Sequence, residues 1–286
     1  MIRTILSPID GSKDSFTSYK YALLLASKFN AAIHVVFIVD QRKTQMPFIY
    51  SGAAYDMAYE RVYIPPDQEM RRLYGRLKSD LKEFADRCIK TCEELSKEMD
   101  VEFSFNISDG FPAAIIEEMS HAADLVVIGQ HGENAGSKKQ TAGSTTEEIV
   151  RSSPRPVIVC PEKFNNPVKI LLPYDGSRAS ENTLQYYTAN FAAFVPEVIF
   201  LCAESDPSED SIYQNEVSYL QQHNSSVKVL RKTGNPIQSI QSIVEEETPD
   251  LIMIGSHGRH KLFDYLLGST TIHVVRKSRV PVLIVY

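Results

Sequence analysis

Glycines and hydroxyl residues near the end of the chain have a spacing that suits anion binding. Gly255 and Gly258 are three residues apart, and after nine further residues Gly268 is followed directly by Ser269 and Thr270. Glycines in a tight loop let backbone N–H groups approach an anion closely. A helix that starts beside them adds free N–H groups at the positive end of its dipole. The pattern predicts two walls of a phosphate site.

The same glycines also have a purely structural interpretation, because any strand-to-helix loop can use glycine to turn the chain. Three observations favour the anion site: the loop follows an apolar run at 251–255, a Gly-Ser pair precedes a helical pattern, and the arrangement occurs twice. The sequence contains no GxxxxGK[ST] motif, and no GxGxxG follows the first strand of either copy. A P-loop NTPase and a dinucleotide-binding dehydrogenase are therefore disfavoured.

The chain consists of two copies of one pattern. "ILSPIDGS" at 5–12 returns as "ILLPYDGS" at 170–177, "ADLVVIGQHG" at 123–132 as "PDLIMIGSHG" at 249–258, and "GSTTEEIV" at 143–150 as "GSTTIHVV" at 268–275. We expect tandem domains at 1–163 and 167–286. The offset between copies falls from 165 to 126 residues, which indicates an insert in the first copy at about 41–75.

Short apolar runs alternate with longer stretches of helical periodicity in both copies. The predicted strands are 32–39, 124–129, 156–160, 169–174, 197–202, 250–255 and 281–286, and the predicted helices include 15–29, 74–99, 112–122 and 236–247. Apolar runs of this kind are typical of parallel strands that are buried on both faces. The alternation predicts a doubly wound α/β sheet in each copy, with ligands at the carboxyl ends of the strands.

Composition excludes several classes of partner. The net charge is −6 and the pI is near 5.7, so no overall basic field exists to bind nucleic acid or an anionic membrane. We expect a cytoplasmic protein, because neither a signal peptide nor an apolar run of about 18 residues is evident. Cys88 and Cys92 alone do not complete a zinc site, and we expect no metal centre.

The combination of "PxDGS" on the first strand with G, two residues, G, nine residues, G and Ser or Thr resembles the universal stress protein family. The resemblance covers both copies and implies five-stranded parallel sheets with helices on both faces, of the adenine nucleotide alpha hydrolase-like kind. It implies ATP, AMP or ADP as ligand, with or without Mg²⁺. It also implies that the final strands "RPVIVC" and "VPVLIVY" pair, which would form an intramolecular pseudo-dimer.

The resemblance assigns candidate nucleotide contacts in each domain. Asp175 and the backbone near Ala203 would contact the adenine side, and the glycine and hydroxyl residues would hold ribose and phosphates. The second domain contributes Pro173, Asp175, Ala203, Gly255, His257, Gly258, Arg259, Gly268, Ser269 and Thr270. The first domain contributes Pro8, Asp10, Ile38, Gly129, His131, Gly132, Gly143, Ser144 and Thr145.

The first copy departs from the family pattern, so binding is better supported in the second. Ten residues, which include Lys138 and Lys139 as possible phosphate contacts, separate Gly132 from Gly143. The matching stretch of the second copy has nine residues and a more apolar sequence.

Histidines and aspartates of the motifs have a catalytic and a structural interpretation. His131 and His257 occupy the same place in the two loops, and imidazole titrates near neutral pH. We favour a hydrogen-bonding role, since no nucleophile with an orienting acid is evident nearby. Asp10 and Asp175 stand in "DGS", which is also a turn and N-cap signature. We therefore assign no catalytic residue.

The resemblance implies a nucleotide-binding regulatory protein of the stress response, in which the bound nucleotide changes a surface that an unknown protein partner recognises and no turnover is needed. One alternative is a slow ATPase or nucleotidyl transferase that uses the same loops, with weak hydrolysis at most. Another is an interaction module with nucleotide-free loops, in which the insert with Tyr50, Tyr55, Tyr59 and Tyr63 contacts the partner. Tandem chains could also form a homodimer.

Overall fold

The computed structural model describes residues 1–44, 49–51, 62–64, 68–132, 142–204, 213–223, 226–257 and 267–286. The first copy forms β1 (Thr4–Ile9), α1 (Lys13–Phe29), β2 (Ala32–Asp40), α2 (Gln41–Thr44), β3 (Ile49–Ser51), β4 (Val62–Ile64), α3 (Gln68–Met99), β5 (Phe103–Gly110), α4 (Pro112–Ser120), β6 (Leu125–Gly129), α5 (Ser144–Ser152) and β7 (Val157–Cys160). The second forms β8 (Lys169–Tyr174), α6 (Arg178–Asn190), β9 (Glu197–Glu204), α7 (Gln214–Gln222), β10 (Ser226–Thr233), α8 (Pro236–Glu247), β11 (Leu251–Gly255), α9 (Ser269–Lys277) and β12 (Val282–Val285).

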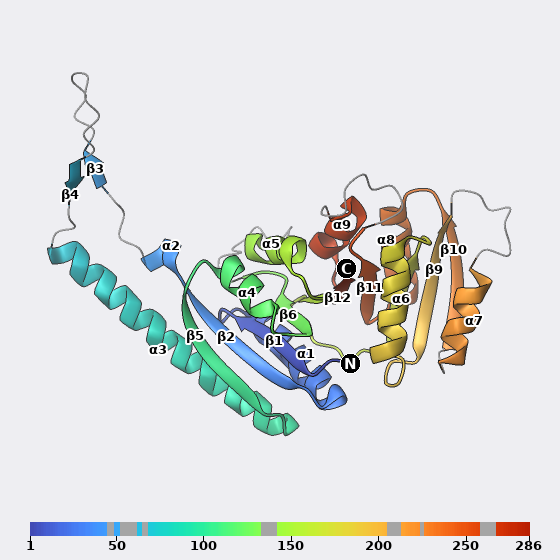
Figure 1. Cartoon of the computed structure of the whole chain (residues 1–286), viewed down its shortest axis with the longest axis horizontal. Coiled ribbons are helices and arrows are strands. Elements are labelled where there is room, and N and C mark those ends of the chain that lie inside the picture. The colour runs from blue at the N-terminus through green and yellow to red at the C-terminus, as the bar shows by residue number, and fades with distance from the viewer. Residues whose placement is uncertain are drawn as a thin grey trace, which may run out of the picture.

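Each copy contributes five parallel strands to one ten-stranded sheet, in the order β10-β9-β8-β11-β12-β7-β6-β1-β2-β5 (Figure 1). Strand order therefore reverses between β1 and β6 in the first domain and between β8 and β11 in the second. The predicted doubly wound, five-stranded fold is confirmed. In such sheets a ligand binds beyond the carboxyl ends of the strands at the point of reversal.

The final strands of the two domains join the sheets. β12 pairs with β7 in antiparallel register, with Leu283 opposite Ile158. Both strands are fully buried. Their pairing removes two apolar strand edges, whose backbone N–H and C=O groups would otherwise be unpaired. The predicted pairing within one chain is confirmed, and it makes the two domains an intramolecular pseudo-dimer.

Helices cover both faces of the sheet, as the continuous apolar strands predict. Core side chains of α1, α3, α6 and α7 form one cluster with one face, and those of α4, α5, α8 and α9 form a second cluster with the other face. The first cluster continues across the junction, where the ring of Phe29 packs edge-on against Phe191 and Phe194. The two domains therefore share a hydrophobic core.

Two edge strands were not located from the sequence. Side chains of β5 and β10 are largely exposed or half-buried, and β10 carries Lys228, Arg231 and Lys232. A strand at the edge of a sheet buries less apolar surface than a central one, and charges there oppose unwanted pairing. These segments consequently lack the continuous apolar run that marks the central strands.

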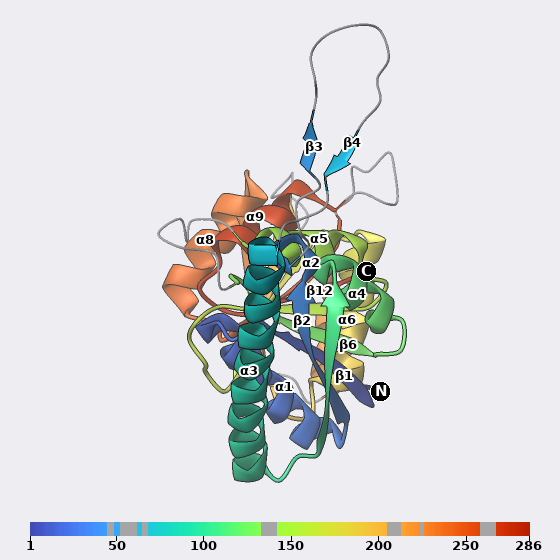
Figure 2. The same ribbon diagram turned by 90° about the vertical axis from the view of Figure 1, so that its left-hand side faces the viewer.

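The segment predicted as insert contains two short strands and the start of α3. α3 begins at Gln68 rather than at Tyr74, so its first turns belong to the segment predicted as insert. β3 and β4 form an antiparallel hairpin, which stands off the main sheet beyond those turns (Figures 1 and 2). Tyr55 and Tyr59 lie outside the described residues.

One ion pair links the domains on the α5 and α9 side of the sheet. Arg276 of α9 donates two hydrogen bonds of 2.6 Å to the carboxylate of Glu147 in α5. This charge-assisted pair lowers the pKa of Glu147 below its usual value. A carboxylate whose pKa is lowered in the folded state contributes stability above its unfolded pKa, and this contribution disappears as the pH falls through the folded value.

We predict that Glu147→Gln lowers the free energy of unfolding at pH 7 by about 0.5 to 1 kcal/mol, a figure discounted because the arginine is partly exposed. The difference from wild type should begin to shrink below the usual glutamate pKa of about 4.3 and should vanish only as the pH falls through the lowered folded-state pKa of Glu147. Urea unfolding at several pH values measures it. Glu246→Gln, at an exposed pair with a longer distance of 3.5 Å to Lys232, is the control and should show little difference. A gap that persists in acid would contradict the assignment.

Candidate nucleotide sites

The "DGS" segments form matching turns at the carboxyl ends of β1 and β8. The Ser12 N–H donates to Asp10 Oδ1 over 3.0 Å, and the Ser177 N–H donates to Asp175 Oδ1 over 3.0 Å. Gly11, which lies between Asp10 and Ser12, has φ +82°, a conformation that glycine adopts without strain. The serine hydroxyls then cap α1 and α6. Both aspartates thus stand beside the point where the strand order reverses.

The first glycine of each loop is required by packing. A Cβ on Gly129 would lie 2.8 Å from the backbone carbon of Asp14, and one on Gly255 would lie 2.8 Å from that of Ala179. The first turns of α1 and α6 therefore rest directly on the ends of β6 and β11. The structure adds this role to the expected one of exposing backbone to an anion.

The helix start of each motif is hydrogen-bonded to the glycine loop that precedes it. The Gly143 N–H donates to Gln130 O and the Gly268 N–H to Ser256 O, both over 2.8 Å. Thr146 Oγ1 donates to Gly129 O over 2.8 Å, and Thr271 repeats this contact with Gly255 at the same distance. These two threonines were missed from the sequence. Their signal was the fourth letter of "GSTT", which both copies retain.

Two helix starts carry N–H groups that could receive an anion. Gly143 and Gly268 are the N-cap residues of α5 and α9, and among the described residues no side chain caps either helix. Ser144 and Ser269 are exposed at the first position. The first N–H groups of a helix have no partner within it, and the dipole favours negative charge there. The donor set therefore fits a phosphate group.

In the first domain the predicted residues converge. A Cβ on Gly132 would lie 2.8 Å from Asp10 Oδ2, and one on Gly143 would lie 3.5 Å from the Gly132 nitrogen. In the second domain a Cβ on Gly268 would lie 3.3 Å from the Cα of His257. The other predicted contacts Gly258, Arg259, Lys138 and Lys139 lie outside the described residues.

The candidate backbone contacts lie where neighbouring strands separate. Pro8 and Pro173 are inside β1 and β8. The ladder between β1 and β2 ends at Phe37, one residue before Ile38, and that between β8 and β9 ends at Cys202, one residue before Ala203. A planar ligand between the strand ends would meet the backbone at these two positions.

The loop histidines bond within the protein and differ between domains. His131 Nδ1 lies 2.8 Å from Asp14 Oδ2, which also accepts the His131 N–H over 3.0 Å. A carboxylate only accepts, so Nδ1 carries the proton. His131 Nε2 is buried and has no hydrogen-bond partner among the described residues. The second domain has Ala179 in place of Asp14, and His257 Nδ1 lies 2.7 Å from Ser256 Oγ.

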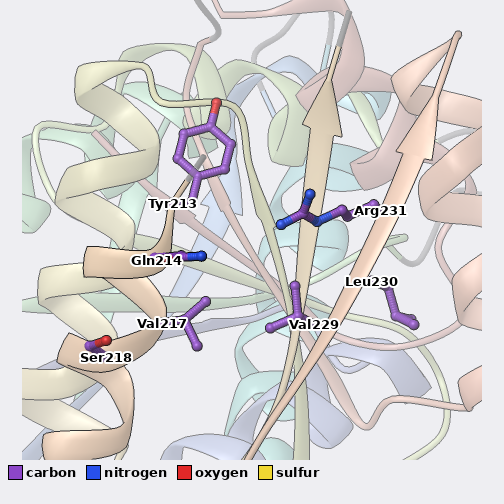
Figure 3. Close-up of a pocket in the computed structure, with 7 residues that line it drawn as sticks. All are labelled: Tyr213, Gln214, Val217, Ser218, Val229, Leu230 and Arg231. Atoms are coloured by element: carbon purple, nitrogen blue, oxygen red, sulfur yellow. The ribbon is translucent and has the colours of Figure 1, made fainter. Parts of the chain in front are cut away.

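A groove of about 600 Å³ lies between α7 and β10 (Figure 3) and was not foreseen. Its lining residues are Tyr213, Gln214, Val217, Ser218, Val229, Leu230 and Arg231. The ring of Tyr213 packs edge-on against Tyr174, the residue before Asp175, at 4.8 Å between centroids. Tyr213 therefore connects the groove to the end of β8, the strand that leads to Asp175.

Cysteine chemistry does not add a further site. Cys88 and Cys92 are buried, and burial raises the pKa of Cys92 to about 12. A protonated thiol is a poor metal ligand and nucleophile. Within the described ranges, no group of three His, Cys, Asp or Glu side chains has the arrangement of a metal site. No helix in this part of the chain is long and apolar enough to cross a membrane.

Comparison with known proteins agrees with this geometry. The sequence model of the universal stress protein family matches twice, over residues 1–161 and 168–286. The chain belongs to the universal stress protein family.

Relatives span the whole chain. Universal stress protein Slr1230 of Synechocystis is 25% identical over 288 residues, which is 99% of this chain and 99% of the relative. Universal stress protein Rv2005c of Mycobacterium tuberculosis is 24% identical over 299 residues and covers 96% of this chain and 94% of its own length. A universal stress protein crystal structure from Archaeoglobus fulgidus has a TM-score of 0.71 at 20% identity, with 99% of this chain and 97% of that chain covered. The tandem fold is thus shared.

We predict that Gly129→Ala and Gly255→Ala each lower the free energy of unfolding by about 1 to 3 kcal/mol, because the added methyl group overlaps helix backbone that cannot move alone. Thermal and urea unfolding measure the loss. Gly75→Ala is the matched control, since nothing lies within 4 Å of a Cβ there and the glycine is inside a helix. It should gain about 0.5 to 1 kcal/mol. Unchanged stability of the first two variants would contradict the close approach.

Proposed function

We propose that this universal stress protein binds an adenine nucleotide, ATP, ADP or AMP, and acts as a regulatory protein in a stress response. One observation carries the proposal: in each domain, a helix start that no described side chain caps and an aspartate turn lie at the point of strand-order reversal. Family membership is consistent with the same ligand. Binding would change a surface that a protein partner recognises, and no turnover is needed.

The phosphates are assigned to the helix starts on electrostatic grounds. The N-terminal N–H groups of α5 and α9 are donors, and the hydroxyls of their Ser-Thr pairs can also donate to a phosphate oxygen. α9 has no acidic residue in its first turn, whereas α5 has Glu147, whose charge Arg276 offsets. Thr145 and Thr270 are half-buried beside the exposed serines. The second site therefore presents the less negative helix start.

The base is assigned to the opposite end of each site. Asp10 and Asp175 each engage a turn N–H through Oδ1, and a carboxylate has further lone pairs that accept from an exocyclic amine. Ile38 and Ala203, just past the last strand pairs, are the nearby backbone positions. An amine donor on the base and a phosphate tail match acceptors at one end and donors at the other. This polarity suits adenine nucleotides.

The second domain is the stronger candidate. The first domain holds the additional buried carboxylate of Asp14 below its glycine loop, where the second has Ala179. A carboxylate close to the loop opposes a phosphate even when His131 screens part of its charge. We therefore expect unequal affinities.

The first test examines nucleotide carried through purification. Protein purified without added nucleotide and then denatured should release an adenine nucleotide that mass spectrometry identifies. Calorimetric titration with ATP and AMP, with and without Mg²⁺, should show binding. Absence of both released nucleotide and binding heat would overturn the proposed function.

The second test places a charge at the phosphate end. Ser269→Asp should weaken ATP binding at the second site at least about fivefold, because two charges about 4 Å apart repel by about 1 kcal/mol or more. The helix itself should not suffer, since an acid suits its first turn. Calorimetry measures the change, and Ser269→Asn is the neutral control of similar size.

The same samples separate binding from hydrolysis. Binding that Ser269→Asp weakens, without phosphate release, supports a binding protein. Phosphate release by wild type that Ser269→Asp abolishes would instead identify an ATPase. Equal affinity of the aspartate and asparagine variants would contradict the phosphate assignment.

A further inference from the structure

Gln130 of the first domain's glycine loop reaches into the second domain. Its side-chain Nε2 donates to the carbonyl oxygens of Val275 over 2.7 Å and Ser278 over 3.2 Å, at the end of α9. Gln130 is only 5% exposed. Both partners are acceptors, so only the amide nitrogen can face them. The contact satisfies last-turn carbonyls that a helix leaves without intrahelical partners.

The backbone of the same residue holds the first site together. The Gln130 carbonyl accepts the N–H of Gly143, where α5 starts, and its N–H donates to the Cys160 carbonyl at the end of β7. One residue therefore contacts the start of α5, the central strand pair and the end of α9.

A second link runs parallel to the first. Glu147 lies in the first turn of α5, and its ion pair joins that turn to Arg276 in the last turn of α9. The N-terminal end of α9 carries Ser269 and Thr270 of the second site. A single helix of nine residues thus connects the two candidate phosphate positions.

In the part of the chain that the structure describes, these two links run only from the first domain's loop and helix start to α9. The second domain has Ser256 where the first has Gln130, and Ile272 where it has Glu147. Ser256 Oγ bonds to the neighbouring His257 within its own loop. The end of α5 is capped from the other domain as well, since the Tyr286 hydroxyl donates to Val150 O over 2.6 Å, but this tyrosine follows β12 and lies outside the glycine loop.

We propose that the two nucleotide sites are coupled through α9, so that occupancy of either site raises the affinity of the other. This inference rests on the proposed function. A helix of nine residues is marginal by itself, and α9 is held both by its buried face, where Val274 and Val275 pack in the core, and by contacts at its two ends. An anion at its N-terminus and the Gln130 and Arg276 contacts at its C-terminus each stabilise the same ordered helix. When one ligand has ordered α9, the other ligand binds without the free-energy cost of ordering this helix, which is positive cooperativity.

Calorimetric titration with ATP measures the coupling in three chains: wild type, Gly143→Val and Gly268→Val. Each valine blocks one site without adding charge, and the φ of −64° at both glycines permits it. The coupling factor is the constant for filling both wild-type sites divided by the product of the two single-site constants. We expect about five or more. Ser144→Phe and Ser269→Phe, at exposed positions, form a second blocking pair that replaces any valine variant that fails to fold.

Gln130→Ser, which installs the residue of the second copy, removes one of the two links and should reduce the factor, and its combination with Glu147→Gln should bring the factor to about one. Tyr286→Phe is the matched control, because it removes a cross-domain hydrogen bond that does not start in a glycine loop. It should leave the factor unchanged. A wild-type factor of one, no effect of Gln130→Ser, or an equal fall in Tyr286→Phe would overturn the coupling. A single binding event overturns it while the proposed function stands, whereas absence of any binding heat overturns both.

Discussion

The close approach of a helix to the end of a strand determines much of this molecule. Gly129 and Gly255 leave no room for a Cβ beside the first turns of α1 and α6. This contact fixes the "DGS" turn next to the glycine loop, because the turn leads directly into the helix. The later helix start, at Gly143 or Gly268, is bonded to the same glycine loop and so lies near the "DGS" turn. Packing and the site therefore depend on one constraint.

The junction between the domains gives the two sites a common framework. Pairing of β7 with β12 removes two apolar edges, and the cores continue across it. Polar contacts are then added at the helix ends, where carbonyl groups require donors. Gln130 and Tyr286 supply those donors from the opposite domain. The stability of α5 and of α9 consequently depends on both copies, although each copy has its own complete fold.

The two copies share the hydrogen bonds that hold the glycine loops and differ in the charged and polar side chains around them. Both keep the Thr146 or Thr271 bond to the glycine carbonyl and the serine cap of the following helix. Only the first has Asp14 bonded to its loop histidine, and only the first has Glu147 and Gln130 directed at the other domain. Duplication thus preserved the contacts that the fold needs. The side chains that distinguish the sites changed around them.

The sequence by itself determined the repeat, the alternation of buried strands and helices, and the residues of the two motifs. These follow from local periodicity and from short patterns such as "DGS", which need no distant partner. It did not locate β5 and β10, because an exposed edge strand lacks the apolar run of a buried one. Nor did it distinguish Gly129 as a packing position, since the neighbour at Asp14 is far away along the chain. Only the tertiary structure decided that Gln130 contacts α9, because a hydrogen bond across 145 residues depends on how two domains meet.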